Sequence, residues 1–97
     1  KVELLETPRN ALVRELNEEL TIRVDPDSLT ACGFAETEPA GAQPGIVILL
    51  YTVRAWDGAP RAEEGANLGW FDFEEANRLP LPPLDVRLLD GLRDRMR

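Results

Sequence analysis

The chain has 97 residues, of which 43% are hydrophobic and 30% charged, as expected for one small globular domain and not for a disordered or membrane-embedded chain. Eighteen acidic and eleven basic residues give a net charge of −7, which argues against a nucleic-acid polymer as partner because that affinity needs Lys and Arg to neutralise phosphates. With no histidine and one cysteine, Cys32, histidine-based triads, histidine-ligated zinc and an internal disulfide are excluded, so carboxylates must carry any acid–base chemistry.

The sequence shows no secretory signal, no lipidation motif and no apolar run near the roughly eighteen residues that a membrane span requires. A cytoplasmic location without a membrane partner is therefore expected.

The first predicted element is a helix from Pro8 to about Leu20. Thr7 is a typical N-cap residue, and Pro8 fits the first helical position because its missing N–H has no partner there anyway. The apolar residues of this segment recur on one face of a helix, as an amphipathic helix packed on a core requires; they are Leu12, Val13, Leu16 and Leu20.

The remaining elements follow from composition and spacing. Residues 24–29 indicate a turn, residues 29–36 a strand, and residues 37–45 a loop rich in Pro and Gly. The apolar, β-branched residues 45–56 predict the central strand, followed by a short strand at residues 68–73 and one or two helical turns. Leucines from Pro83 onward recur at helical spacing, which predicts a C-terminal helix packed on the sheet. This order indicates an α/β or α+β domain.

The first helix carries an unusual acidic cluster. Glu15, Glu18 and Glu19 fall within roughly 100° of arc, beside the apolar face, so three like charges crowd the rim of the core. Like charges at these spacings destabilise a helix, and a hard cation such as Mg²⁺ or Mn²⁺ would relieve the repulsion. The alternative is an ordinary solvated acidic face, which is the commoner fate of such clusters.

The pattern around the cluster resembles the signature of the Nudix hydrolases. Glu6 is followed by seven residues and then "RELNEELTI", and seven positions match in register: Glu6, Arg14, Glu15, Leu16, Glu18, Glu19 and Ile22. The likeness to MutT-type members continues through "WDGAPRAEEGANLGWF" and "LPPLD", so it covers nearly the whole chain.

This resemblance implies a Nudix-type α/β/α sandwich, in which a mixed sheet is flanked by the Nudix helix and the C-terminal helix. It implies hydrolysis of a nucleoside triphosphate, including oxidised forms such as 8-oxo-dGTP, to the monophosphate and pyrophosphate. Mg²⁺ or Mn²⁺ would be held by Glu15, Glu18, Glu19 and Glu64, with Arg14 completing the catalytic set. Lys1 and Asp85 would contact the substrate, a small nucleotide, and the protein would be a monomer or homodimer.

Each assignment has a structural alternative. Arg14 either orients Glu18 through a forked hydrogen bond or forms an exposed ion pair with it, and Glu6 is expected to stabilise the helix N-terminus. The alternative for Glu64 is a solvated loop glutamate without a ligand role, and the alternative for Asp85 is an ordinary N-cap. Trp56, Trp70, Phe71 and Phe73 are expected in the core, and Cys32 as a small buried hydrophobe.

The chain also departs from the family pattern. Thr21 stands where the signature has glycine, Leu5 precedes Glu6 where glycine is usual, and the signature's first glycine would precede Lys1. We therefore interpret residues 1–97 as a single Nudix domain that lacks the N-terminal strands and that first glycine. Alternative functions are hydrolysis of other nucleoside diphosphate derivatives (CTP-like nucleotides, dinucleoside polyphosphates or sugar nucleotides) and a non-catalytic module that binds a nucleotide or a partner.

Overall fold

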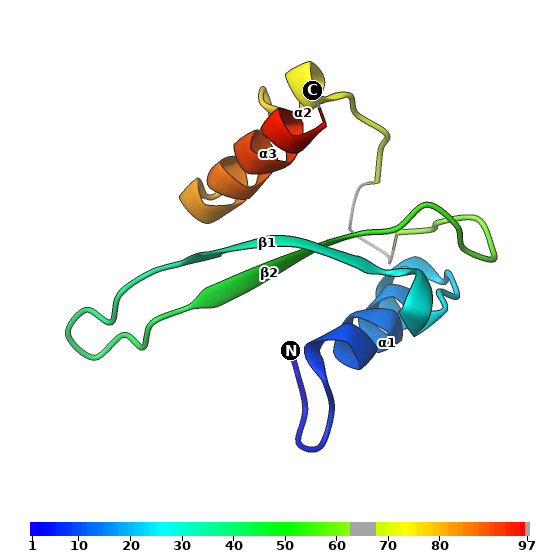
Figure 1. Ribbon diagram of the computed structural model, residues 1–97, viewed down its shortest axis with the longest axis horizontal. Helices are drawn as coiled ribbons and strands as arrows, with labels where there is room; N and C mark the ends of the chain where they lie inside the picture. Colours follow the sequence, from blue (N-terminus) through cyan, green and yellow to red (C-terminus); the bar gives the residue numbers. More distant parts are fainter. Residues whose placement is uncertain (63–67, 97) are drawn as a thin grey trace. The chain divides into compact units, whose positions relative to one another are not determined.

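The computed structural model describes residues 1–62 and 68–96 (Figure 1). Its elements in chain order are α1 (Pro8–Leu20), the 3₁₀ helix η1 (Pro26–Ser28), β1 (Thr30–Glu36), β2 (Val47–Thr52), α2 (Phe73–Ala76) and α3 (Pro83–Arg95). The chain divides into two compact units. The first unit comprises Lys1–Thr30 and Thr52–Gly69, and the second comprises Ala31–Tyr51 and Trp70–Arg97.

Helix α1 has the bounds that its sequence predicts. The backbone N–H of Asn10 donates to Thr7 Oγ1 at 3.1 Å, and Pro8 occupies the first turn, so the predicted N-cap is confirmed. At the other end Thr21 adopts the left-handed conformation, with φ 58° and ψ 27°, and its N–H donates to the Asn17 carbonyl. The helix therefore ends with the backbone geometry that glycine adopts most easily, but with a β-branched residue in that place.

The first unit builds its small core from the segment that follows α1. Ile22, Val24 and Leu29 are buried there together with Ala11 of the helix. The Arg9 guanidinium ties α1 to η1, because its Nη1 donates to the carbonyls of both Pro26 and Leu29. The predicted turn at residues 24–29 is thus confirmed, as a short 3₁₀ helix capped by Asp25.

The turn at Asp57 and Gly58 docks against the end of α1. Arg23 and Asp57 exchange two backbone hydrogen bonds of 2.9 Å, and the N–H of Arg61 donates to the Leu20 carbonyl at 2.9 Å. Gly58 has φ +96°, and a Cβ there would lie 3.1 Å from the Thr21 carbonyl oxygen. The close approach therefore requires glycine on both steric and conformational grounds.

The second unit contains most of the β-hairpin and the C-terminal helix. Strands β1 and β2 run antiparallel (Figure 1), and Thr37 N–H donates to the Ile46 carbonyl where the loop begins. Ala35 of β1 and Leu84 of α3 are buried. The strands predicted at residues 29–36 and 45–56 are both present, although β2 ends at Thr52 and not at residue 56. No helix of the described chain is long and apolar enough to cross a membrane.

The strand predicted at residues 68–73 is wrong. Residues 68–72 have no regular structure, and Phe73 instead begins α2. Asp72 caps this helix, accepting from Glu75 N–H at 2.8 Å while the Glu75 side chain accepts from Asp72 N–H. A capping box of this kind offers the backbone local partners that compete with a strand ladder. The sheet of the described residues is a two-stranded hairpin in the order β1-β2.

The aromatic residues also depart from expectation. Trp70 is 76% exposed and Phe71 is exposed, so neither belongs to the core of the described structure. Trp56, Phe73 and Cys32 are half-buried. Without a strand at residues 68–73 there is no pleated face to direct Trp70 and Phe71 inward.

The left-handed conformation of Thr21 generates a prediction. Replacing Thr21 with Gly should raise the free energy of unfolding by about 1 kcal/mol, because glycine adopts positive φ without a Cβ clash. For a domain of this size that gain raises Tm by about 4–8 °C, measurable by calorimetry. The Tm of Thr21→Asn should lie between those of the unchanged chain and Thr21→Gly, since Asn tolerates this conformation. A Tm for Thr21→Gly at or below that of the unchanged chain would show that the cap is not strained.

Candidate active site

Arg14 lies at the centre of the acidic residues of the first unit. Its Nε donates to Glu6 Oε2 at 2.9 Å, and its Nη2 donates to Glu6 Oε1 at 3.1 Å. This forked pair is the strongest geometry available to a guanidinium and a carboxylate. The side chains of Arg14 and Glu6 are only 28% and 18% exposed, so water weakens the pair less than it would at an open surface.

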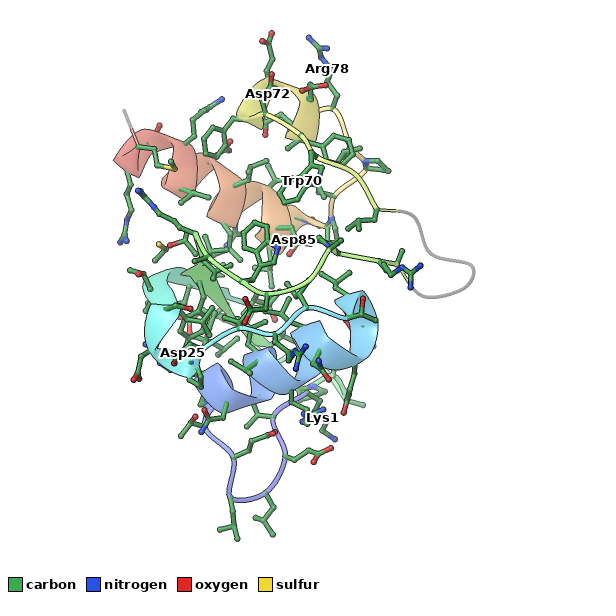
Figure 2. The ribbon with its side chains drawn as sticks, turned by 90° about the vertical axis from the view of Figure 1, so that its right-hand side faces the viewer. Lys1, Asp25, Trp70, Asp72, Arg78 and Asp85 are labelled. Atoms are coloured by element: carbon green, nitrogen blue, oxygen red, sulfur yellow. The ribbon has the colours of Figure 1, made fainter. Side chains whose placement is uncertain are left out.

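The same guanidinium also reaches the glutamates of the signature. Arg14 Nη1 donates to Glu18 Oε2 at 3.2 Å, and Nη2 lies 3.7 Å from Glu15 Oε1. Nη2 further donates to the Lys1 carbonyl at 2.7 Å. Figure 2 shows Lys1 beside α1. The structure therefore brings Arg14, Glu15, Glu18 and the backbone of Lys1 together.

One part of the prediction needs correction. The forked hydrogen bond of Arg14 goes to Glu6, while Glu18 receives a single bond. Seven residues lie between Glu6 and Arg14, and Glu6 precedes the N-cap, so helix periodicity alone does not place the two side chains together. The spacing of the signature could have revealed the pair, because it holds a glutamate and an arginine at a fixed separation.

These contacts change the acidity of Glu6. The hydrogen bonds from Arg14, together with one from the Glu3 backbone N–H, lower the pKa of Glu6 to about 2. Glu6 in turn raises the pKa of Arg14 above its already high ordinary value. Glu6 is therefore an ionised anchor for Arg14 and is unsuited to act as a general base near neutral pH, because a base needs a pKa close to the working pH.

The signature glutamates supply ligands of the correct chemical type for a hard divalent cation. Carboxylate oxygens are preferred by Mg²⁺ and Mn²⁺, and Glu15, Glu18 and Glu19 lie on one face of α1. Glu18 is 59% exposed and Glu19 is also exposed, so both can reorient toward an ion. Among the residues that the structure describes, no three acidic or cysteine side chains already stand close enough to hold a metal.

Glu64, the fourth predicted ligand, lies outside the described residues. Among the described residues before it, Arg61 donates its backbone N–H to the carbonyl of Leu20 at the end of α1.

Asp85 belongs to the second unit, in the first turn of α3 (Figure 2). The N-cap of this helix is Pro82, so Asp85 is not the N-cap that the structural alternative assumed. Asp85 lines a groove of about 220 Å³, and every other side chain around it is apolar: Leu50, Ala76, Leu79, Leu81, Leu88, Leu89 and Leu92. An apolar groove with one carboxylate is suited to a planar ring that carries hydrogen-bond donors.

Comparison with known proteins bears directly on this arrangement. The NUDIX domain family matches residues 1–92. An 8-oxo-dGTP diphosphatase of Escherichia coli K12 is 31% identical over 93 residues, which cover 96% of this chain and 69% of the relative. A CTP pyrophosphohydrolase of the same organism is 38% identical, with 94% and 64% covered. The solution structure of the E. coli ORF135 protein superposes with a TM-score of 0.85 at 33% identity, covering 99% of this chain and 66% of that one.

The chain therefore belongs to the NUDIX family, and its helices and antiparallel sheet are those of an α/β Nudix fold. The relatives indicate a pyrophosphohydrolase enzyme, and the family generally uses divalent cations. The chain spans about two thirds of the length of the relatives that it matches. MutT-like identity, expected from the residues around the signature, is confirmed.

The acidity of Glu6 gives a prediction about stability. Because its pKa is lowered on folding, Glu6 stabilises the folded state above its unfolded pKa of about 4.5, and this contribution disappears as the pH falls toward 2. Glu6→Gln should therefore be less stable than the unchanged chain at pH 6, and the difference should shrink steadily between pH 5 and pH 2. Urea unfolding at each pH measures it. An equal difference at pH 6 and pH 2 would contradict an ionic role.

Proposed function

We propose that this protein hydrolyses a nucleoside triphosphate to the monophosphate and pyrophosphate with the help of Mg²⁺ or Mn²⁺. The observation that carries the proposal is the contact of Arg14 with Glu6, Glu15 and Glu18 in the register of the signature. An arginine without a functional role at a protein surface typically pairs with one carboxylate. Arg14 instead donates to the side chains of Glu6 and Glu18 and to the carbonyl of Lys1. Such anchoring is what a positioning residue needs.

The metal would be held by Glu15, Glu18 and Glu19, joined by Glu64 from its loop. When bound, the cation neutralises charge on the phosphate oxygens and acidifies the attacking water. The chain contains no histidine, so a glutamate of this set must accept the proton from that water. Glu6 is not available for this task because Arg14 holds it ionised with a pKa of about 2.

Arg14 would act through its neighbours. Anchored by Glu6, it fixes Glu18 by a hydrogen bond and lies close to Glu15, so both side chains lose rotamers that point away from the cation. It also offsets part of the repulsion among the glutamates before a metal arrives. Lys1 contributes through its carbonyl, which accepts from Arg14, and we propose that its side chain contacts the phosphates of the substrate.

The base of the nucleotide would enter the groove that contains Asp85. An ionised carboxylate only accepts hydrogen bonds, so it favours a base edge with adjacent donors. Guanine-type bases present two neighbouring donors, N1–H and N2–H, whereas cytosine presents one donor beside an acceptor. Asp85 therefore favours a guanine-type substrate, oxidised forms included, over a CTP-like one.

The cytoplasmic location and the oligomeric state, monomer or homodimer, stay predictions.

Replacing Asp85 with Asn tests this assignment. An amide can both accept and donate, so it also matches the edge of cytosine, and the ratio of kcat/KM for guanine-type over cytosine-type triphosphates should fall about tenfold or more. Steady-state kinetics on the two substrate classes, canonical and oxidised, measures the ratio. If kcat/KM falls equally for both substrate classes, Asp85 acts on stability or on the phosphates, and another residue selects the base.

The metal site is tested by Glu19→Gln, an isosteric change at an exposed helix position. Pyrophosphate release in the presence of Mg²⁺ should fall by about 10²–10⁴, as for the loss of a group that acts in the transition state. The matched control is Glu38→Gln, which removes the same charge from the exposed hairpin loop and should keep full activity. Each protein is tested as the 97-residue chain and with any residues that its gene encodes upstream of Lys1.

Calorimetry on the same proteins separates an enzyme from a non-catalytic module. Mg²⁺ at ten times its Kd should stabilise the unchanged chain by about 1.4 kcal/mol through linkage, and should stabilise Glu19→Gln much less. Undiminished turnover in Glu19→Gln would sink the proposed site. A folded protein that neither hydrolyses any nucleotide nor responds to Mg²⁺ would favour the binding module.

A further inference from the structure

The second unit contains another groove, of about 250 Å³, between the hairpin and α3. The strands contribute Cys32, Phe34 and Leu50 to its lining. Helix α3 contributes Arg87, Gly91 and Arg95, together with two leucines. The lining therefore combines an apolar interior with two cationic groups, which neither the metal site nor the groove of Asp85 offers.

The sequence of α3 explains the shape of this groove. Arg87, Gly91 and Arg95 are each four residues apart, so they follow one another along one face of the helix, and the two arginine Cα atoms are about 12 Å apart along the axis. Glycine in the middle leaves a notch between the two long side chains. A Cβ added at Gly91 would meet no atom within 4 Å, so the notch is open space.

The two guanidinium groups have no acidic partner in the described structure. The ion pairs of the second unit join Arg78 to Glu74 and Arg93 to Asp90, and none among the described residues involves Arg87 or Arg95. Carboxylates are abundant in this chain, which has eighteen acidic and eleven basic residues. The lining of this groove therefore holds two arginines and no carboxylate, although Asp90 and Asp94 lie elsewhere on the same helix.

We propose that this groove binds a small organic carboxylate, whose apolar body lies between the hairpin and α3 and whose carboxylate pairs with Arg87 and Arg95. Guanidinium groups recognise carboxylates by paired N–H donors, and the apolar lining favours a hydrocarbon or aromatic body. The groove is smaller than the roughly 300 Å³ at which pockets for drug-sized ligands begin. It is therefore too small for a whole nucleoside triphosphate and suits a compact acid with one or two rings.

This site goes beyond the proposed hydrolysis and can be tested separately from it. Leu50, Leu88 and Leu92 line both this groove and the groove of Asp85, so changes at these leucines would disturb both. Arg87, Gly91 and Arg95 line only the groove proposed here. Variants at these three positions leave the proposed metal ligands and Asp85 untouched.

Cys32 provides a direct readout, because it lines the groove and is the only cysteine of the chain. The test measures the rate at which N-ethylmaleimide alkylates Cys32, followed by mass spectrometry, with 2-naphthoate as the probe. We expect 2-naphthoate to slow alkylation at least fivefold and saturably, with a half-maximal concentration on the order of 0.1–1 mM for a ligand of this size. The neutral analogue 2-naphthamide has the same rings and should give little protection.

Three variants complete the experiment, with circular dichroism to confirm that each is folded. Arg87→Gln combined with Arg95→Gln should abolish protection by 2-naphthoate, whereas Arg78→Gln, which breaks only an exposed ion pair with Glu74, should leave it unchanged. Gly91→Phe should fill the notch and protect Cys32 without any probe.

Three results would overturn the proposal. One is equal protection by 2-naphthoate and 2-naphthamide, which would make the groove a general hydrophobic surface. Another is protection that persists when both arginines are replaced. The third is a dimer in sedimentation velocity with Cys32 already protected, which would show that a second copy of the chain covers the groove.

Discussion

The forked pair between Arg14 and Glu6 is the interaction on which the candidate active site depends. Three glutamates on one face of a helix repel one another, and Arg14 offsets part of that repulsion because it donates to Glu18 and lies 3.7 Å from Glu15. A guanidinium in contact with several carboxylates would move among them if nothing else held it. Glu6 holds two of its nitrogens, so the remaining donor faces the glutamates in a fixed direction.

The end of α1 is a second constraint, and it positions the turn at Asp57 and Gly58. The helix stops in a left-handed residue, Thr21, and the chain then exchanges backbone hydrogen bonds with Asp57, while Gly58 approaches the Thr21 carbonyl. This docking carries Arg61 to the last turn of the helix. Local strain at Thr21 thus accompanies the docking of this turn on α1, and strain of this kind is common beside functional sites.

The chemical roles are divided between the two compact units. The first holds Arg14 and the signature glutamates, and the second holds Asp85 and both grooves of α3. The chain passes between the units after Thr30, Tyr51 and Gly69, so neither unit is a continuous segment. In the proposed function, hydrolysis and recognition of the base therefore make separate demands on the sequence.

The sequence by itself determined the elements whose signals are local. Helix α1 begins and ends at its predicted residues because its signals are local. These signals are the N-cap at Thr7, the proline at position 8 and the spacing of the apolar residues. The register of Arg14, Glu15 and Glu18 likewise follows from the helical repeat, and the hairpin and α3 follow from their apolar patterns. The strand at residues 68–73 failed because a capping box at Asp72 and Glu75 competes locally with a strand, whose partner must come from elsewhere in the chain.

Only the tertiary structure decided which groups meet across long separations. It assigned the fork of Arg14 to Glu6, placed Arg61 beside Leu20, and put Asp85 in an apolar groove and not at a helix cap. These contacts join residues that no helical or strand period relates, so their formation depends on how the chain folds back on itself and not on the pattern of neighbouring residues.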